Sequence, residues 1–264
     1  MKALFTLLPH ESKRLIAKGV SVLPEVKAAL SNGKIAIAGG ISNGYVAEEL
    51  SGEKIGKGSY TAGIVTEGVQ CLTDAGMRLK PFLINQGKSE SANLAEAVQS
   101  FERDDVFIKG ANAVDIDKNA GVLMANPKGG TVSIYPLLVA RGCHLIIPVG
   151  LEKLVPDVIE ASNAMGITHM DKRFGKACGM LPITTGKVIT EIEAFALLTG
   201  ITATHVASGG VSGSEGACTF VVEGDQDQLD DTVALVKQLK KEPTLSAEKQ
   251  LCSDCNDPCE MLSP

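Results

Sequence analysis

The sequence contains no tryptophan, and aromatic residues make up only 4% of its 264 residues. Proteins that hold bases by stacking need several exposed aromatic side chains, so we expect no such surface. Positive charge is also scarce: the net charge is −6, the pI is about 5.3, and the densest basic stretch is the KQLKK of residues 237–241. Because nucleic-acid surfaces carry clustered cations, we expect no nucleic-acid partner.

Long apolar runs are missing as well. A membrane-spanning helix needs roughly 20 consecutive apolar residues, and no segment approaches that length. The apolar stretch before Pro9 is too short for a signal-peptide core. We therefore expect a cytoplasmic protein with no membrane partner. The seven cysteines are an odd number and lie mostly in apolar segments, which favours reduced thiols over a disulfide framework.

What the chain has in quantity is glycine, 28 residues, within a composition that is 44% hydrophobic and 21% charged. That balance is typical of a globular protein large enough to bury a sizeable core. Strand-like apolar segments at 34–38, 81–85, 106–108 and 145–149 alternate with helical patterns at 11–32, 45–50, 91–101 and 152–165. Such alternation predicts an α/β fold with a mostly parallel, three-layer sheet.

The pattern changes near residue 187. A strand at 188–189 is followed by Thr190 with Glu193 three residues later, which is a capping box, and then by a helix to 198. Strands at 203–207 and 218–223 and a helix at 228–240 complete a small α+β unit of the split βαβ type. We expect an α/β domain at 1–185, this unit at 186–243, and a flexible, cysteine-rich tail at 244–264.

A glycine turn follows the strand at 34–38 and leads into a helix. Its candidate ligand-binding residues are Gly39, Gly40, Ser42 and Asn43. Backbone N–H groups at such a helix start point toward an anion. The turn is equally typical of a plain strand-to-helix connection in which Ser42 or Asn43 caps the helix.

A second polar segment follows the strand at 106–108. It contains Lys109, Asn112 and Asp115, and further along the chain come Lys128 and a turn formed by Gly129, Gly130 and Thr131. Ligands bind at the carboxyl ends of the strands in open α/β sheets. Lysines and carboxylates in that position suit anion binding and proton transfer. A hydrated loop built from Asx turns is the alternative.

Three short motifs suggest a family. The sequences GANAVD at 110–115, PKGG at 127–130 and LVA at 138–140 resemble ribose-5-phosphate isomerase, whose superfamily includes glucosamine-6-phosphate deaminases and CoA transferases. The resemblance covers about residues 34–150. It implies a phosphate site at the glycine turn near Ser42 and a pocket between the two glycine turns.

Several residues depart from that family's pattern. Lys109 stands where the isomerase motif begins with an acid, Asn112 falls on its second Asp, and Pro136 falls near its catalytic Glu, while Asp115 and Lys128 keep their type. Because an amide cannot act as a carboxylate base, enediol chemistry should not carry over unchanged. A CoA-transferase-type nucleophile would have to be Glu152, which can also be a first-turn helix acid. The catalytic candidates are therefore Asp115, Lys128 and Glu152.

The C-terminal segment carries Cys252, Cys255 and Cys259 in a C-x2-C-x3-C arrangement. Three thiolates at this spacing can converge on zinc or an iron–sulfur cluster. Such sites usually have four ligands, so the fourth would come from another cysteine, a histidine, a second subunit or a partner. Exposed thiols with no metal are the alternative.

We therefore expect a protein that binds a small anionic ligand, such as a sugar phosphate or an acyl-CoA-like molecule. It would be an isomerase- or transferase-like enzyme with altered chemistry, and a homo-oligomer. Two alternatives stay open. One is a metal-associated redox or assembly protein that works through the tail cysteines, and the other is a non-catalytic ligand sensor.

Overall fold

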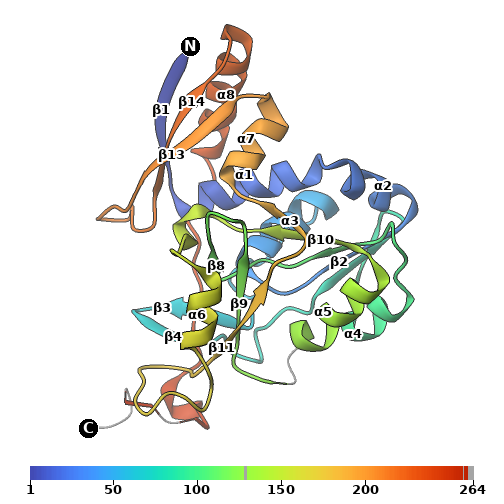
Figure 1. Cartoon of the computed structure of the whole chain (residues 1–264), viewed down its shortest axis with the longest axis vertical. Helices are drawn as coiled ribbons and strands as arrows, with labels where there is room; N and C mark the ends of the chain where they lie inside the picture. The colour runs from blue at the N-terminus through green and yellow to red at the C-terminus, as the bar shows by residue number, and fades with distance from the viewer. Residues whose placement is uncertain (128–129, 258, 261–264) are drawn as a thin grey trace.

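A six-stranded mixed sheet lies at the centre of the structure, a computed structural model that describes residues 1–127, 130–257 and 259–260 (Figure 1). In the order given below, its first four strands are parallel to one another, the fifth runs antiparallel to them, and the sixth runs antiparallel to the fifth. In order across the sheet, the strands are β12 (Lys187–Ile189), β10 (His144–Pro148), β7 (Val106–Ile108), β2 (Lys34–Ile37), β5 (Phe82–Asn85) and β6 (Lys88–Ser91).

Both faces of this sheet are buried. Successive side chains of a strand point to opposite faces, so each strand contributes to two hydrophobic cores. In β2, Ile35 and Ile37 join one hydrophobic core and Ala36 joins the other. The first core is covered by α1 (Pro9–Ser21), α2 (Pro24–Asn32) and α3 (Ile41–Ser51), and the second by α4 (Leu94–Ala97), η1 (Val98–Ser100) and α5 (Gly130–Arg141). The helical pattern at 11–32 is divided into two helices, because Pro24 starts α2.

The strand β5, which runs antiparallel to both of its neighbours, makes the sheet mixed rather than purely parallel. The two-residue turn between β5 and β6 has positive φ at both Gln86 (47°) and Gly87 (77°). Two left-handed residues in a two-residue loop produce a tight hairpin, which forces β6 to run antiparallel to β5. The expectation of an α/β fold is therefore confirmed, and a mixed six-stranded sheet is what the structure contains.

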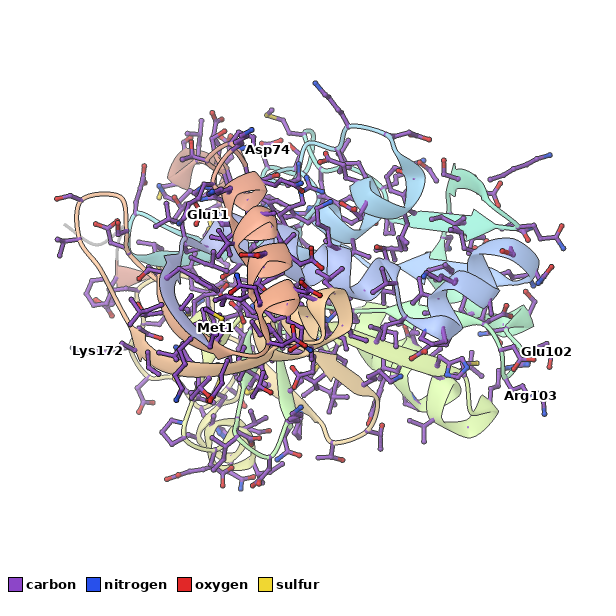
Figure 2. The ribbon with its side chains drawn as sticks, turned by 90° about the horizontal axis from the view of Figure 1, so that it is seen from above. Met1, Glu11, Asp74, Glu102, Arg103 and Lys172 are labelled. Atoms are coloured by element: carbon purple, nitrogen blue, oxygen red, sulfur yellow. The ribbon has the colours of Figure 1, made fainter. Side chains whose placement is uncertain are left out.

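A second sheet joins the two ends of the chain. Strand β1 (Lys2–Leu7) pairs with β14 (Cys218–Glu223), which pairs with β13 (Thr202–Ser208), all antiparallel. Helices α7 (Glu191–Thr199) and α8 (Gln226–Leu239) pack here with α1, and Figure 2 shows α8 lying across this part of the molecule. The N-terminal strand was not expected from the sequence. Strand β12 follows the domain boundary predicted near residue 185, yet it extends the six-stranded sheet.

The remaining elements form smaller units beside the six-stranded sheet (Figure 1). A small antiparallel sheet contains β8 (Ala113–Val114), β9 (Ala120–Met124) and β11 (Gly179–Ile183), and a hairpin contains β3 (Gly63–Thr66) and β4 (Val69–Leu72). Also present are α6 (Val158–Ala164), η2 (Leu151–Lys153) and η3 (Cys252–Asp254). None of the helices in the described ranges combines the length and apolar character that a bilayer span requires.

Candidate functional site

Charged and polar side chains gather where the four parallel strands end. Polar residues follow β7 and β12 at once, and Ser42 and Glu152 follow β2 and β10 after short apolar and glycine segments, in line with the rule for ligand sites in open α/β sheets. Together with one lysine from α1, these side chains form what we call the strand-end cluster. Its members are Lys13, Ser42, Asn43, Lys109, Glu152, Lys153 and Glu191.

The turn after β2 has the strand–turn–helix form expected from the sequence. Gly40 is the N-cap of α3, and no side chain caps this helix, so neither Ser42 nor Asn43 acts as the cap. Asn43 is fully buried, and its Nδ2 donates to the Ala38 carbonyl at 2.7 Å. Asn43 Oδ1 and Ser42 Oγ are buried with no hydrogen-bond partner among the described residues. An unsatisfied buried polar atom costs about 1–3 kcal/mol, which a bound ligand can offset.

Three strand ends meet directly in front of Asn43. A Cβ placed on Gly110, just after β7, would lie 3.1 Å from Asn43 Oδ1 and 3.3 Å from the Pro148 carbonyl at the end of β10. A larger residue at position 110 would therefore press against both groups. The glycine keeps the backbone close to the unpartnered amide oxygen, as sites that hold a ligand near the backbone require.

Two lysines approach the same place from neighbouring loops. Lys109 Nζ donates to the Gly110 carbonyl at 2.9 Å, and Lys153 Nζ donates to the Ala111 carbonyl at 2.9 Å. Burial lowers the pKa of Lys109 to about 8, and repulsion by Lys153 adds to this effect. Burial also lowers the pKa of Lys153, although the attraction of Glu152 and Glu191 opposes it. Both residues keep partial solvent exposure along their side chains, while burial of the amines is the main cause of the lowered pKa values.

The two glutamates of the cluster are driven to different protonation states. Lys13 Nζ and Glu152 Oε1 form an ion pair at 2.6 Å. Burial alone would raise the pKa of Glu152, but the charges of Lys13 and Lys153 lower it. Glu191 is fully buried, and burial together with the charge of Glu152 raises the pKa of Glu191 to about 7. Its carboxyl accepts a hydrogen bond from the Leu151 N–H at 3.0 Å. Titratable groups whose pKa values are pushed apart in this way are typical of functional sites.

Two residues predicted from the sequence make local structural contacts. Asp115 accepts hydrogen bonds from the Asn119 N–H and side-chain amide, both at 2.9 Å, and from the Val158 N–H at 3.1 Å. These bonds lower the pKa of Asp115 despite its burial, and they hold the β8–β9 turn against the start of α6. Asn112 Oδ1 accepts from the Leu123 N–H at 3.1 Å. The Asp115 geometry matches the Asx-type loop that the sequence left open, whereas the Asn112 bond joins two segments 11 residues apart.

The second glycine turn is described only in part. Lys128 and Gly129 lie outside the described residues, while Gly130 and Thr131 begin α5. The pocket expected between the two glycine turns therefore stays a prediction. The structure brings together Ser42, Asn43, Lys109 and Glu152 from the predicted set.

Three members of the cluster were not identified from the sequence. Glu191 and Lys153 follow strand ends closely, so the same rule that singled out Lys109 would have found them. Lys13 has no such signal, because it lies on an N-terminal helix and only the packing of α1 places it beside Glu152.

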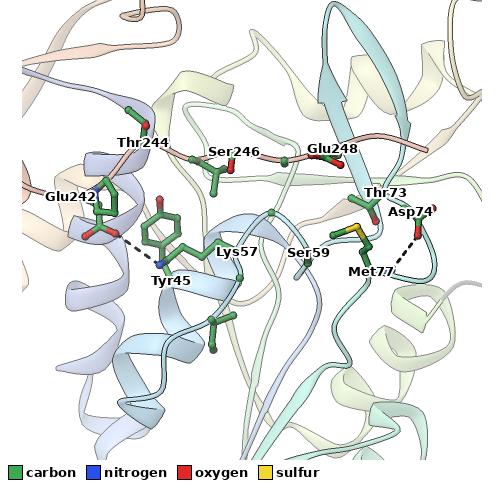
Figure 3. Close-up of a pocket in the computed structure, with 16 residues that line it drawn as sticks. Tyr45, Lys57, Ser59, Thr73, Asp74, Met77, Glu242, Thr244, Ser246 and Glu248 are labelled. Atoms are coloured by element: carbon green, nitrogen blue, oxygen red, sulfur yellow. Dashed lines mark hydrogen bonds and ion pairs between the residues drawn. The ribbon is translucent and has the colours of Figure 1, made fainter. Parts of the chain in front are cut away.

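A separate cleft of about 320 Å³ lies between α3, residues 55–59 and the C-terminal segment 242–248 (Figure 3). Lys57 Nζ lies 4.7 Å from the centre of the Tyr45 ring and pairs with Glu48 at 2.8 Å. Arg14 covers the same ring at 5.1 Å and pairs with Glu242 at 2.9 Å. The charged side chains beside this cleft already form ion pairs with one another. The strand-end cluster is therefore the stronger candidate for a ligand site.

Comparison of the chain with protein-family models, curated proteins and solved structures finds no match in any of the three. The function must therefore be argued from the geometry of the strand-end cluster.

The first test concerns the electrostatics of this cluster. Replacing Lys153 by methionine is expected to raise the pKa of Lys109 from about 8 toward its ordinary 10.5, because a repelling cation is removed. Reductive ¹³C-methylation of the lysines and NMR titration would measure this pKa, with Lys109→Arg identifying its signal. Lys88→Met, at an exposed position on β6, serves as the control. An unchanged Lys109 titration in Lys153→Met would contradict the coupling.

Proposed function

We propose that this protein binds a small anionic ligand, a sugar phosphate or an acyl-CoA-like molecule, at the strand-end cluster. One observation carries the proposal: two lysine amines and the start of α3 lie at the strand ends beside Asn43, whose buried Oδ1 has no hydrogen-bond partner among the described residues. A helix start offers free N–H groups and a partial positive charge, and the lysines add full positive charges. The oxygens of an anion accept from these N–H groups and lysines, and a hydroxyl group of the same ligand, as on a sugar phosphate or CoA, donates to Asn43 Oδ1.

We further propose isomerase- or transferase-like chemistry in which Lys109 replaces the carboxylate base. With a pKa of about 8, roughly a tenth of this amine is neutral at pH 7. A neutral amine beside a bound carbonyl compound can accept a proton, and the neighbouring ammonium of Lys153 stabilises the negative charge that develops. Helices on both faces of the six-stranded sheet support the related proposal of a mostly parallel, three-layer fold of the isomerase and CoA-transferase kind.

Thermal unfolding with candidate ligands tests the binding. Inorganic phosphate, ribose 5-phosphate and acetyl-CoA would be screened, and a ligand present at 100 times its Kd is expected to stabilise the fold by about 2.7 kcal/mol. Lys109→Met should weaken binding at least tenfold, because a charge-assisted hydrogen bond is worth about 1.5–3 kcal/mol. Lys88→Met should bind like the wild type.

No stabilisation by any of these anions, or equal binding by Lys109→Met, would refute the proposal. Stabilisation without turnover of the bound ligand would favour the non-catalytic sensor over the enzyme. In that case the pH dependence of binding should still follow the titration of Lys109.

A further inference from the structure

The C-terminal segment is fastened to β4, the strand that contains Cys71. Lys249 forms a β-bridge with Thr73, and the Gln250 N–H donates to the Leu72 carbonyl at 2.9 Å. Figure 1 shows this segment at the end of the molecule that carries β3 and β4. Lys249 lies within electrostatic reach of both Cys71 and Cys252. Two cysteines that are distant in sequence therefore share one cationic neighbour.

A second tether brings the other two tail cysteines to the same strand. The Lys176 N–H donates to the Gln70 carbonyl at 2.8 Å, which places the 173–176 loop beside β4. Arg173 binds Asp257 through both guanidinium nitrogens, at 2.6 and 3.1 Å. The Glu260 N–H donates to the Arg173 carbonyl at 3.0 Å, and the Arg173 guanidinium lies within electrostatic reach of Cys255 and Cys259.

We propose that Cys71 is the fourth ligand of a tetrathiolate metal site completed by Cys252, Cys255 and Cys259. Four thiolates suit zinc or an iron–sulfur cluster. Lys249 and Arg173 lie near these cysteines and, although they also pair with Glu67 and Asp257, they would offset part of the negative charge that four thiolates bring to one ion. This site is separate from the strand-end cluster and does not depend on the function proposed there.

Cys178 is the competing fourth ligand, and the local geometry disfavours it. Its sulfur accepts a hydrogen bond from Gln70 Nε2 at 3.2 Å, and the residue is buried. Gln70 and Cys71 are neighbours in β4, so their side chains point to opposite faces of the strand. The face that carries Cys71 is therefore the one turned away from Cys178.

Metal binding must also draw the sulfurs closer together. Among residues 1–127, 130–257 and 259–260, no three His, Cys, Asp or Glu side chains are grouped closely enough to hold one ion. Binding should therefore tighten the segment that follows Gln250 against β4. Hydrogen exchange in this segment should slow when metal is added to the metal-free protein.

The test is metal analysis of the full-length chain purified without oxygen. We expect one zinc ion or one iron–sulfur cluster per chain, and elemental analysis with an absorption spectrum distinguishes the two. Cys71→Ser should lower the metal affinity at least about a hundredfold, since even residues that only orient a ligand cost 10- to 100-fold when replaced. Cys178→Ser and Cys143→Ser, a half-buried thiol beside β10, should keep wild-type affinity.

Three results would overturn the proposal: no metal above trace levels in the wild type, wild-type affinity in Cys71→Ser, or loss of metal in Cys178→Ser instead. Thermal unfolding of the metal-free wild type and of Cys71→Ser controls for misfolding. The two should unfold at the same temperature, and only the wild type should gain stability when zinc or the reconstituted cluster is supplied.

Discussion

Replacing Lys13 by methionine is expected to lower the free energy of unfolding by about 3–5 kcal/mol. Lys13 and Glu152 form a 2.6 Å ion pair whose side chains are only 8% and 11% exposed. Without Lys13, the carboxylate of Glu152 stays in the protein interior with its main counter-charge removed, and its Oε2 already has no hydrogen-bond partner among the described residues. Urea unfolding at pH 7 measures the loss.

Two controls separate this effect from a general cost of losing lysine. The double variant Lys13→Met/Glu152→Gln removes both charges and should recover a large part of the lost stability. Lys2→Met breaks a pair with Glu223 in which both side chains are more than 60% exposed, so it should cost less than about 1 kcal/mol. If Lys13→Met cost no more than Lys2→Met, the buried pair would not contribute as argued.

The Glu191→Gln variant is expected to become more stable than the wild type as the pH rises. Burial and the charge of Glu152 raise the folded-state pKa of Glu191 from its ordinary 4.5 to about 7. The folded wild type therefore holds a proton that the unfolded chain releases, so the contribution of Glu191 is fully present below pH 4.5 and is lost as the pH rises through 7. A shift of this size corresponds to about 3 kcal/mol.

Urea unfolding of both proteins from pH 4 to pH 9 tests this prediction. The stability of Glu191→Gln relative to wild type should increase by about 3 kcal/mol across that range, with most of the change between pH 5 and pH 8. Lys109, whose pKa is about 8, titrates at higher pH than Glu191. Glu223→Gln, at an exposed position on β14, should give a flat difference. A flat difference for Glu191→Gln would mean that its carboxyl is ionised in the folded protein.

Both predictions concern the same feature of the site. Lys13 lowers the pKa of Glu152, and the charge of Glu152 raises the pKa of Glu191. Lys153 interacts with both glutamates and with Lys109. A change of charge on a bound ligand at Lys109 should therefore shift the proton on Glu191. The charged groups of the cluster are coupled through contacts already present in the folded chain.

Part of this site follows from local sequence. The apolar strand at 34–38, its glycine turn and the helix after it were predicted correctly, because strand alternation and glycine conformational freedom are local properties. The capping box of Thr190 and Glu193 was also predicted and is present, with the Thr190 N–H donating to Glu193 Oε2 at 2.9 Å. Lys109 was identified because a polar residue that directly follows a buried strand lies at the carboxyl end of that strand, where ligands bind in open α/β sheets.

By itself, the sequence determined the α/β class, the position of the glycine turn and the presence of Lys109 at a strand end. Only the tertiary structure decided that Lys13 pairs with Glu152, that β1 joins the C-terminal strands, and that the tail lies against the strand containing Cys71. These contacts join residues far apart in the chain, and no periodicity or turn signal encodes which distant segment will cover a given face. The glycine turn after β2 is specified by its own residues. The charges around it are set by how distant parts of the chain pack together, which local sequence does not reveal.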